Sequence, residues 1–131
     1  LNYAGQTFPL LGVLPVETDV SKKPQGHGYV QGKIIRKNPF FSLNSQVCGH
    51  EFHYSSCQPT GEENLNFALS LSRGVGISQS MDCMLFRNVM AGYTHIHALG
   101  HDEWAENFVR AASLFKKCRE NGEECPDIGA E

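Results

Sequence analysis

Several features that define large classes of protein are absent from this chain of 131 residues. No run approaches the roughly eighteen apolar residues of a membrane-spanning helix, so the sequence predicts no membrane partner. Basic side chains number 11 against 14 acidic ones, and the net charge of -3 argues against a nucleic-acid partner. The phosphate-binding motif G-x-x-x-x-G-K-[ST] is missing. What remains is a globular composition, with 40% hydrophobic and 19% charged residues.

The cysteines form neither a C-x-x-C pair nor an even set, which argues against a zinc ribbon and a disulfide framework. They are Cys48, Cys57, Cys83, Cys118 and Cys125. The first residues show no charged and apolar signal-peptide pattern. Together these features predict reduced thiols in a cytoplasmic protein. The chain begins at Leu1 rather than Met, which allows either processing or a start partway through a longer protein, and the motifs described below favour the second.

Most of the chain shows the patterns of β-strands separated by turns. The apolar, proline-broken stretch 8–16 predicts a loop leading into a short strand, and a polar link covers 17–26. Glycine-rich or polar loops are expected at 58–64 and 74–82, and a turn near Arg87 and Asn88. Strands are then predicted at 27–37, 46–57, 65–74, 83–86 and 89–94.

One segment near the end of the chain predicts an amphipathic helix at 102–119. Its apolar stripe is Trp104, Phe108, Ala111, Phe115 and Cys118. We expect Trp104, Phe108 and Phe115 to pack against the sheet, and Asn121-Gly122 to end the helix. This places one partial domain at 1–120 and an acidic tail at 121–131. So few strands and one helix leave sheet edges open, so we expect uncovered apolar surface and a possible homodimer.

The histidines cluster in two places, GHEFHYS and YTHIHALGH. Because alternate residues of a strand share a face, His95 and His97 form a pair that could bind a metal, with His101 as a third ligand. No Cys, Asp or Glu stands at a matching zinc spacing, and a lone H-x-H pair is more often structural. The same pair also suits a general base beside a cysteine nucleophile. A metal-holding or non-catalytic β-rich binding module therefore remains the alternative to an enzyme.

None of the cysteines suits the role of nucleophile. Such a thiol stands on a sharp turn between a strand and a helix, flanked by glycines. The five cysteines lie instead within or beside strands, in the last helix and in the tail. We expect buried or incidental thiols at all five positions.

Several segments together resemble the glutaminase domain of the cobyrinate a,c-diamide synthase family, the CobB/CobQ-type class I glutamine amidotransferases. The strongest are GHEFHYS (49–55), NVMAGYTHIHALG (88–100) and DEWAENFVRAA (102–112). The segments LLGVLPVET and HGYV extend the resemblance over residues 8–112. It implies a flavodoxin-like α/β fold, of which this chain is the C-terminal, strand-rich part.

The resemblance also implies the roles of site residues. His95 matches the family's general base, and His97 stands where other class I amidotransferases carry a Glu that orients the base. His53, Tyr54 and Ser55 lie on the strand expected to hold the substrate glutamine. His50 and Glu51 are expected to support that strand, and no metal is expected.

Two departures from the family pattern affect what this chain can do alone. The family's nucleophile lies in an E-C-G-G turn upstream of the segment matching Leu1, so we expect the chain alone to hydrolyse no glutamine. Cys83 stands where relatives commonly carry Gly after Asp. The resemblance places ATP and Mg²⁺ in a further synthetase domain and predicts a tetrapyrrole dicarboxylate such as cobyrinate as the acceptor of glutamine-derived ammonia.

Overall fold

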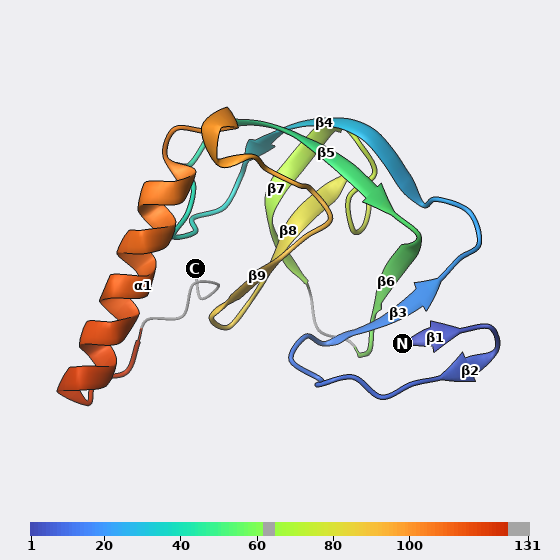
Figure 1. Ribbon diagram of the computed structural model, residues 1–131, viewed down its shortest axis with the longest axis horizontal. Helices are drawn as coiled ribbons and strands as arrows, with labels where there is room; N and C mark the ends of the chain where they lie inside the picture. Colours follow the sequence, from blue (N-terminus) through green and yellow to red (C-terminus); the bar gives the residue numbers. More distant parts are fainter. Residues whose placement is uncertain (62–64, 126–131) are drawn as a thin grey trace.

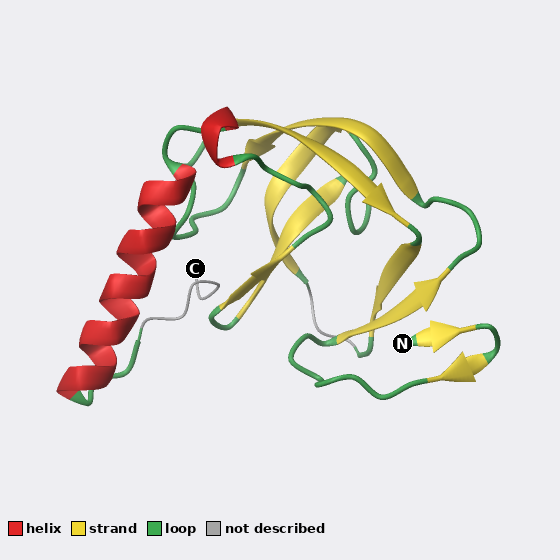
Figure 2. Ribbon diagram, viewed as in Figure 1, coloured by secondary structure: helices red, strands yellow, loops and turns green. Residues whose placement is uncertain are grey.

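The computed structural model of the chain describes residues 1–61 and 65–125. Over these residues it contains two sheets and one α-helix (Figures 1 and 2). The strands are β1 (Asn2–Tyr3), β2 (Gln6–Thr7), β3 (Val16–Val20), β4 (Gly26–Ile34), β5 (Gln46–His53), β6 (Ser55–Pro59), β7 (Asn66–Arg73), β8 (Met81–Phe86) and β9 (Val89–Ala91). A 3-10 turn, η1 (Ala98–Gly100), precedes helix α1 (Trp104–Asn121).

The larger sheet has the strand order β5-β4-β7-β8-β9, and each neighbouring pair is antiparallel. The smaller sheet has the order β2-β1-β3-β6 and includes the parallel pair β1 and β3. A strand-rich chain with one C-terminal helix is consistent with an α/β amidotransferase domain, as predicted. The flavodoxin-like arrangement stays a prediction.

The core lies against one face of the larger sheet. Alternate residues of β4 point into it, and Val30 and Ile34 are buried there beside Val47 of β5 and Leu69 of β7. This alternation is the reason that the strand pattern of 27–37 was readable in the sequence. The opposite face of β4 and β5 carries exposed side chains, among them His27, His50 and Phe52.

The strands differ from those predicted at several boundaries: β1 and β2 were not expected, β4 ends at Ile34 rather than at residue 37, and β8 begins at Met81 within the expected loop 74–82. Three further differences bear on the site. The segment 46–57 is two strands in different sheets, because the chain leaves the larger sheet after His53 and enters the smaller one at Ser55. The expected link 17–26 contains most of β3, which pairs with β6. β9 ends at Ala91 instead of residue 94. The last difference matters most, because it places His95 and His97 beyond the strand that was expected to carry them.

The helix forms where it was predicted, but the expected burial of Phe108 and Phe115 against the sheet is wrong. Phe108 is 52% exposed and Phe115 48% exposed, and Cys118 is the buried residue of α1. Trp104 is partly buried against the core. The end of the helix is as expected, since Gly122 adopts the left-handed C-cap conformation at a φ of 69°. Residues 126–131 of the predicted acidic tail lie outside the described residues.

Candidate active site

His95 sits at the open edge of strand β5, opposite His50. The His95 N–H donates to the His50 carbonyl at 2.7 Å, and the His50 N–H donates to the His95 carbonyl at 3.1 Å. The two imidazole rings are 5.8 Å apart between centroids and both residues are exposed. The structure thus joins the GHEFHYS and YTHIHALG segments at one point and leaves the ring of His95 open to solvent.

Gly49 allows the two segments to approach this closely. A Cβ atom at residue 49 would lie 2.7 Å from the His95 carbonyl oxygen and 2.8 Å from Cγ2 of Thr94. The His95 carbonyl oxygen belongs to the backbone, so it cannot move away as the end of a flexible side chain could. The glycine before the histidine pair is therefore a steric requirement of the site.

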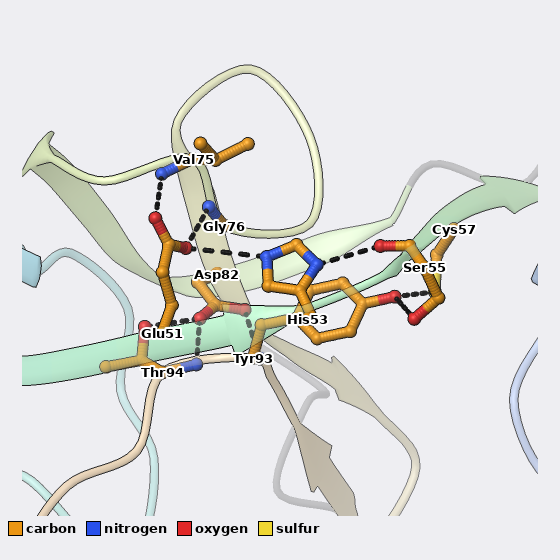
Figure 3. A network of polar contacts seen from close by, with 9 residues as sticks. All are labelled: Glu51, His53, Ser55, Cys57, Val75, Gly76, Asp82, Tyr93 and Thr94. Carbon is orange, nitrogen blue, oxygen red and sulfur yellow. Dashed lines mark hydrogen bonds and ion pairs between the residues drawn. The ribbon is translucent and has the colours of Figure 1, made fainter. Parts of the chain in front are cut away.

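A buried carboxylate holds the chain just before His95 (Figure 3). Asp82 of β8 has no solvent exposure, and its Oδ1 accepts the Tyr93 N–H at 3.1 Å. Its Oδ2 accepts the Thr94 N–H at 2.7 Å and the Thr94 hydroxyl. Sequence reasoning missed Asp82, although an acidic residue directly before the apolar run Cys83-Met84-Leu85 is an available signal, because a buried carboxylate requires donors.

The side chain of His53 points into the molecule. Its ring stacks on that of Tyr93, with centroids 3.7 Å apart and planes 4° apart. Its Nδ1–H donates to the Ser55 carbonyl at 2.8 Å, and its Nε2 lies 3.6 Å from a Glu51 carboxylate oxygen. His53 is thereby engaged inside the fold and fixes the bend between β5 and β6.

Glu51 is the second buried carboxylate of the site. It accepts the N–H groups of Val75 at 2.7 Å and Gly76 at 3.0 Å, on the loop between β7 and β8. These contacts link β5 to that loop and to His53, and the supporting role expected for Glu51 stays a prediction.

Tyr93 connects this network to the smaller sheet. Its hydroxyl lies 2.8 Å from Ser55 Oγ and 3.2 Å from Cys57 Sγ. Burial, together with the hydrogen bond between the phenol and Cys57, raises the pKa of the Tyr93 phenol to about 12. Of the three residues expected to hold glutamine, His53 and Ser55 therefore contact Tyr93, while Tyr54 is exposed beside Phe52.

The three histidines of YTHIHALGH point to different surroundings. His97 Nδ1 accepts the Leu99 N–H at 3.1 Å and caps η1. His101 packs edge-on against Phe41, with ring centroids 4.9 Å apart. Within residues 1–61 and 65–125 no three His, Cys, Asp or Glu side chains are placed to share a metal ion, and nothing there favours the metal-holding alternative.

Comparison with known proteins decides the family. A model of the CobB/CobQ-like glutamine amidotransferase domain matches residues 2–103, most of the chain. The chain belongs to this amidotransferase family. The match includes every predicted site residue and ends one residue before α1.

Three curated relatives of this chain share the name cobyrinate a,c-diamide synthase. This chain is 38% identical to the cobyrinate a,c-diamide synthase of Magnetococcus marinus over 110 residues. The aligned residues make up 84% of this chain and 23% of the relative. The synthases of Methanosphaera stadtmanae and Archaeoglobus fulgidus are 36% and 33% identical, over 81% and 83% of this chain. The chain thus spans about a quarter of these relatives, in their C-terminal part. No solved structure matches it, and no helix among its described residues has the length and apolarity to cross a bilayer.

Cys83, where the family resemblance predicts Gly, has a glycine-like backbone conformation. Its φ is 54°, in the left-handed region where glycine is favoured and other residues are strained. Burial and the neighbouring Asp82 raise the pKa of the Cys83 thiol to about 12, so this cysteine is a poor nucleophile.

Proposed function

We propose that this chain supplies the general base of a glutaminase site in an ATP-dependent a,c-diamide synthase, which transfers glutamine-derived ammonia to carboxylates of a cobyrinate-like tetrapyrrole. The observation that carries the proposal is the paired bridge between His95 and His50. It places an exposed imidazole at a sheet edge through two backbone hydrogen bonds, and no hydrogen bond from residues 1–61 or 65–125 occupies a His95 ring nitrogen.

The proposed reaction uses His95 twice. A cysteine supplied by another part of the synthase gives its thiol proton to the imidazole, and the thiolate attacks the carboxamide carbon of glutamine. As the C–N bond breaks, the imidazolium returns the proton to the leaving nitrogen, which departs as ammonia. Water then cleaves the thioester to release glutamate. His97 is tied to Leu99 instead of His95, so we assign it to holding the start of η1.

The backbone of 53–55 was expected to contact glutamine, but its carbonyl groups already have partners. The His53 carbonyl accepts the Gln25 N–H, the Tyr54 carbonyl accepts the Ser21 N–H, and the Ser55 carbonyl accepts His53. We therefore propose that the exposed side chains of Tyr54 and His50 flank the substrate. His53 and Ser55 contribute by holding Tyr93, two residues before the base.

The family resemblance places ATP and Mg²⁺ in a further synthetase domain. We propose that activation of the tetrapyrrole carboxylate belongs to that domain, and the lack of the phosphate-binding motif G-x-x-x-x-G-K-[ST] in this sequence supports the proposal.

A chimera tests the proposal. The matching C-terminal residues of the Magnetococcus marinus synthase are replaced by this chain, and ammonia release from glutamine is measured with and without cobyrinate and ATP. We expect an active chimera, and we expect His95→Ala to lower kcat by about 10²–10⁴-fold, the usual contribution of a general base. His101→Gln, which changes a histidine six positions away in the same segment, is the control. Full ammonia release by the His95→Ala chimera would contradict the proposal.

A further inference from the structure

We infer that Asp82 is the positioning residue of His95: its buried carboxylate holds the backbone of residues 93 and 94 and so sets where the imidazole stands. The inference rests on the proposed function, since it takes His95 as the base. It adds a residue that belongs to neither histidine motif and lies on a different strand, β8.

The first step is that both oxygens of Asp82 are used on one short segment. Oδ1 accepts the Tyr93 N–H, and Oδ2 accepts both the N–H and the hydroxyl of Thr94. Hydrogen bonds to a carboxylate are stronger than those between neutral groups, and the site is excluded from water. Asp82 thus fixes two successive peptide groups at a point where no strand pairing does so, because β9 has already ended.

The second step is that the hydrogen-bonded amides of residues 93 and 94 are followed directly by the hydrogen-bonded amide of His95. Thr94 is bound to Asp82, and the next N–H, that of His95, is bound to the His50 carbonyl. Three consecutive amides are therefore held from two strands, β8 on one side and β5 on the other. Without Asp82, the hydrogen bond from the His95 N–H to the His50 carbonyl would be the one that remains on these three amides among the described residues.

The third step is that glycines flank these hydrogen-bonded amides on both sides. A Cβ at residue 92 would lie 2.8 Å from Asp82 Oδ1, and a Cβ at residue 49 would lie 2.7 Å from the His95 carbonyl oxygen. The segment from 92 to 95 is thereby drawn close to both anchors. A carboxamide at residue 82 would turn an N–H₂ group toward one of the donors and leave a buried N–H unpaired.

The experiment compares four variants of the chimera. Asp82→Asn removes the anchor, Thr94→Val removes the Thr94 hydroxyl but keeps the methyl group over Gly49, and Thr94→Ser keeps the hydroxyl but removes the methyl. Ile34→Val weakens a fully buried core position on β4, two strands from β8, and controls for a general loss of stability. Kinetic constants for glutamine are measured together with hydrogen exchange of the residue 95 amide.

We expect Asp82→Asn to lower kcat by about 10–100-fold with KM for glutamine within about twofold, because a base displaced by about 1 Å loses this much rate. Thr94→Val should lower kcat several-fold and Thr94→Ser should retain it. Exchange at the residue 95 amide should speed up in Asp82→Asn and Thr94→Val but not in Ile34→Val. If Asp82→Asn does not fold, the two Thr94 variants carry the test.

The outcomes separate the two claims. An active His95→Ala chimera would overturn the proposed function, and the positioning role with it. A His95→Ala chimera that is inactive, combined with Asp82→Asn and Thr94→Val variants that keep the parent kcat and exchange rate, would overturn the positioning role alone. A KM that rises while kcat stays constant would likewise overturn it, because misplacing a base changes the chemical step.

Discussion

At the scale of single residues, the environment of Cys83 makes stability depend on pH. The thiol's pKa rises from an ordinary 9.0 to about 12 in the folded chain, chiefly through burial. Between these values the unfolded chain has lost the proton and the folded chain has kept it. The Cys83 thiol therefore leaves the free energy of unfolding unchanged below about pH 9 and lowers it as pH rises toward 12.

We expect the free energy of unfolding to decrease in this window by up to about 1.4 kcal/mol per pH unit for this one proton. Urea unfolding at pH 7, 9 and 10.5 measures the decrease. In Cys83→Ala the free energy of unfolding should decrease less steeply with pH than in the parent chain. Tyr93→Phe should also make this decrease less steep, but by a smaller amount, because the pKa of Tyr93 is raised too. Equal slopes in the parent chain and Cys83→Ala would contradict this explanation.

Gly49 gives a second prediction at this scale. Gly49→Ala introduces a Cβ against the backbone of His95 and should break the bridge to His50. In the chimera we expect kcat for glutamine hydrolysis to fall by about tenfold or more. Gly61→Ala is the matched control, since a Cβ there meets no atom within 4 Å. Parent-like activity of Gly49→Ala would show that the bridge is dispensable.

At the scale of elements, the attachment of α1 depends on its first turns. Asn107 Nδ2 donates to the Phe40 carbonyl at 2.9 Å, and Phe108 stacks on Phe40. Glu103 accepts the Ser42 N–H at 3.1 Å and the Ser42 hydroxyl at 2.6 Å. The hydrogen bonds from Ser42 lower the pKa of the Glu103 carboxyl.

A lowered pKa in the folded chain means that this attachment is complete above pH 4.5 and is lost as pH falls below it. We expect Glu103→Gln to speed hydrogen exchange of the Ser42 amide at pH 7, and the parent chain to approach that rate at acidic pH after correction for intrinsic exchange. Glu106→Gln, a neighbouring change on the same helix, is the control. An unchanged Ser42 exchange rate in Glu103→Gln would argue against the attachment.

Sequence patterns predicted these elements unequally, for physical reasons. The stripe from Trp104 to Cys118 fixes a helix, because its period of about 3.6 residues depends on the helix alone. The period does not predict which element packs against the stripe, and in this structure much of the stripe is exposed to solvent. The break at Tyr54 was missed because alternation continues through it, and the sheet change depends on pairing with β3. His50, Glu51 and His95 were predicted from motifs, whereas the contacts of Asp82 are with residues distant in sequence, so it left only a weak local signal.

At the scale of the whole molecule, apolar side chains are exposed in several regions. One is the segment before β3, where Leu11 is 95% exposed and Leu10 and Val13 are also exposed. Another is α1, with Phe108, Val109, Leu114 and Phe115 exposed. Exposed apolar surface of this kind favours association.

We therefore expect the isolated chain to self-associate. Its weight-average mass in sedimentation equilibrium should rise with concentration above 14.5 kDa. Val109→Glu and Phe115→Glu should shift this rise to higher concentration, and Lys117→Glu, a charge change on the same helix, should shift it much less. A concentration-independent monomer would contradict the prediction.

The pairing of His50 with His95 also has a consequence for the order of folding. The β4–β5 and β7–β8 hairpins join neighbouring parts of the chain, whereas the bridge joins residues far apart in sequence and costs more loop-closure entropy. His95 should pair with His50 only after both hairpins have formed. Variants that loosen residues 92–95 should then accelerate unfolding and leave the refolding rate nearly unchanged, the behaviour of contacts made after the transition state.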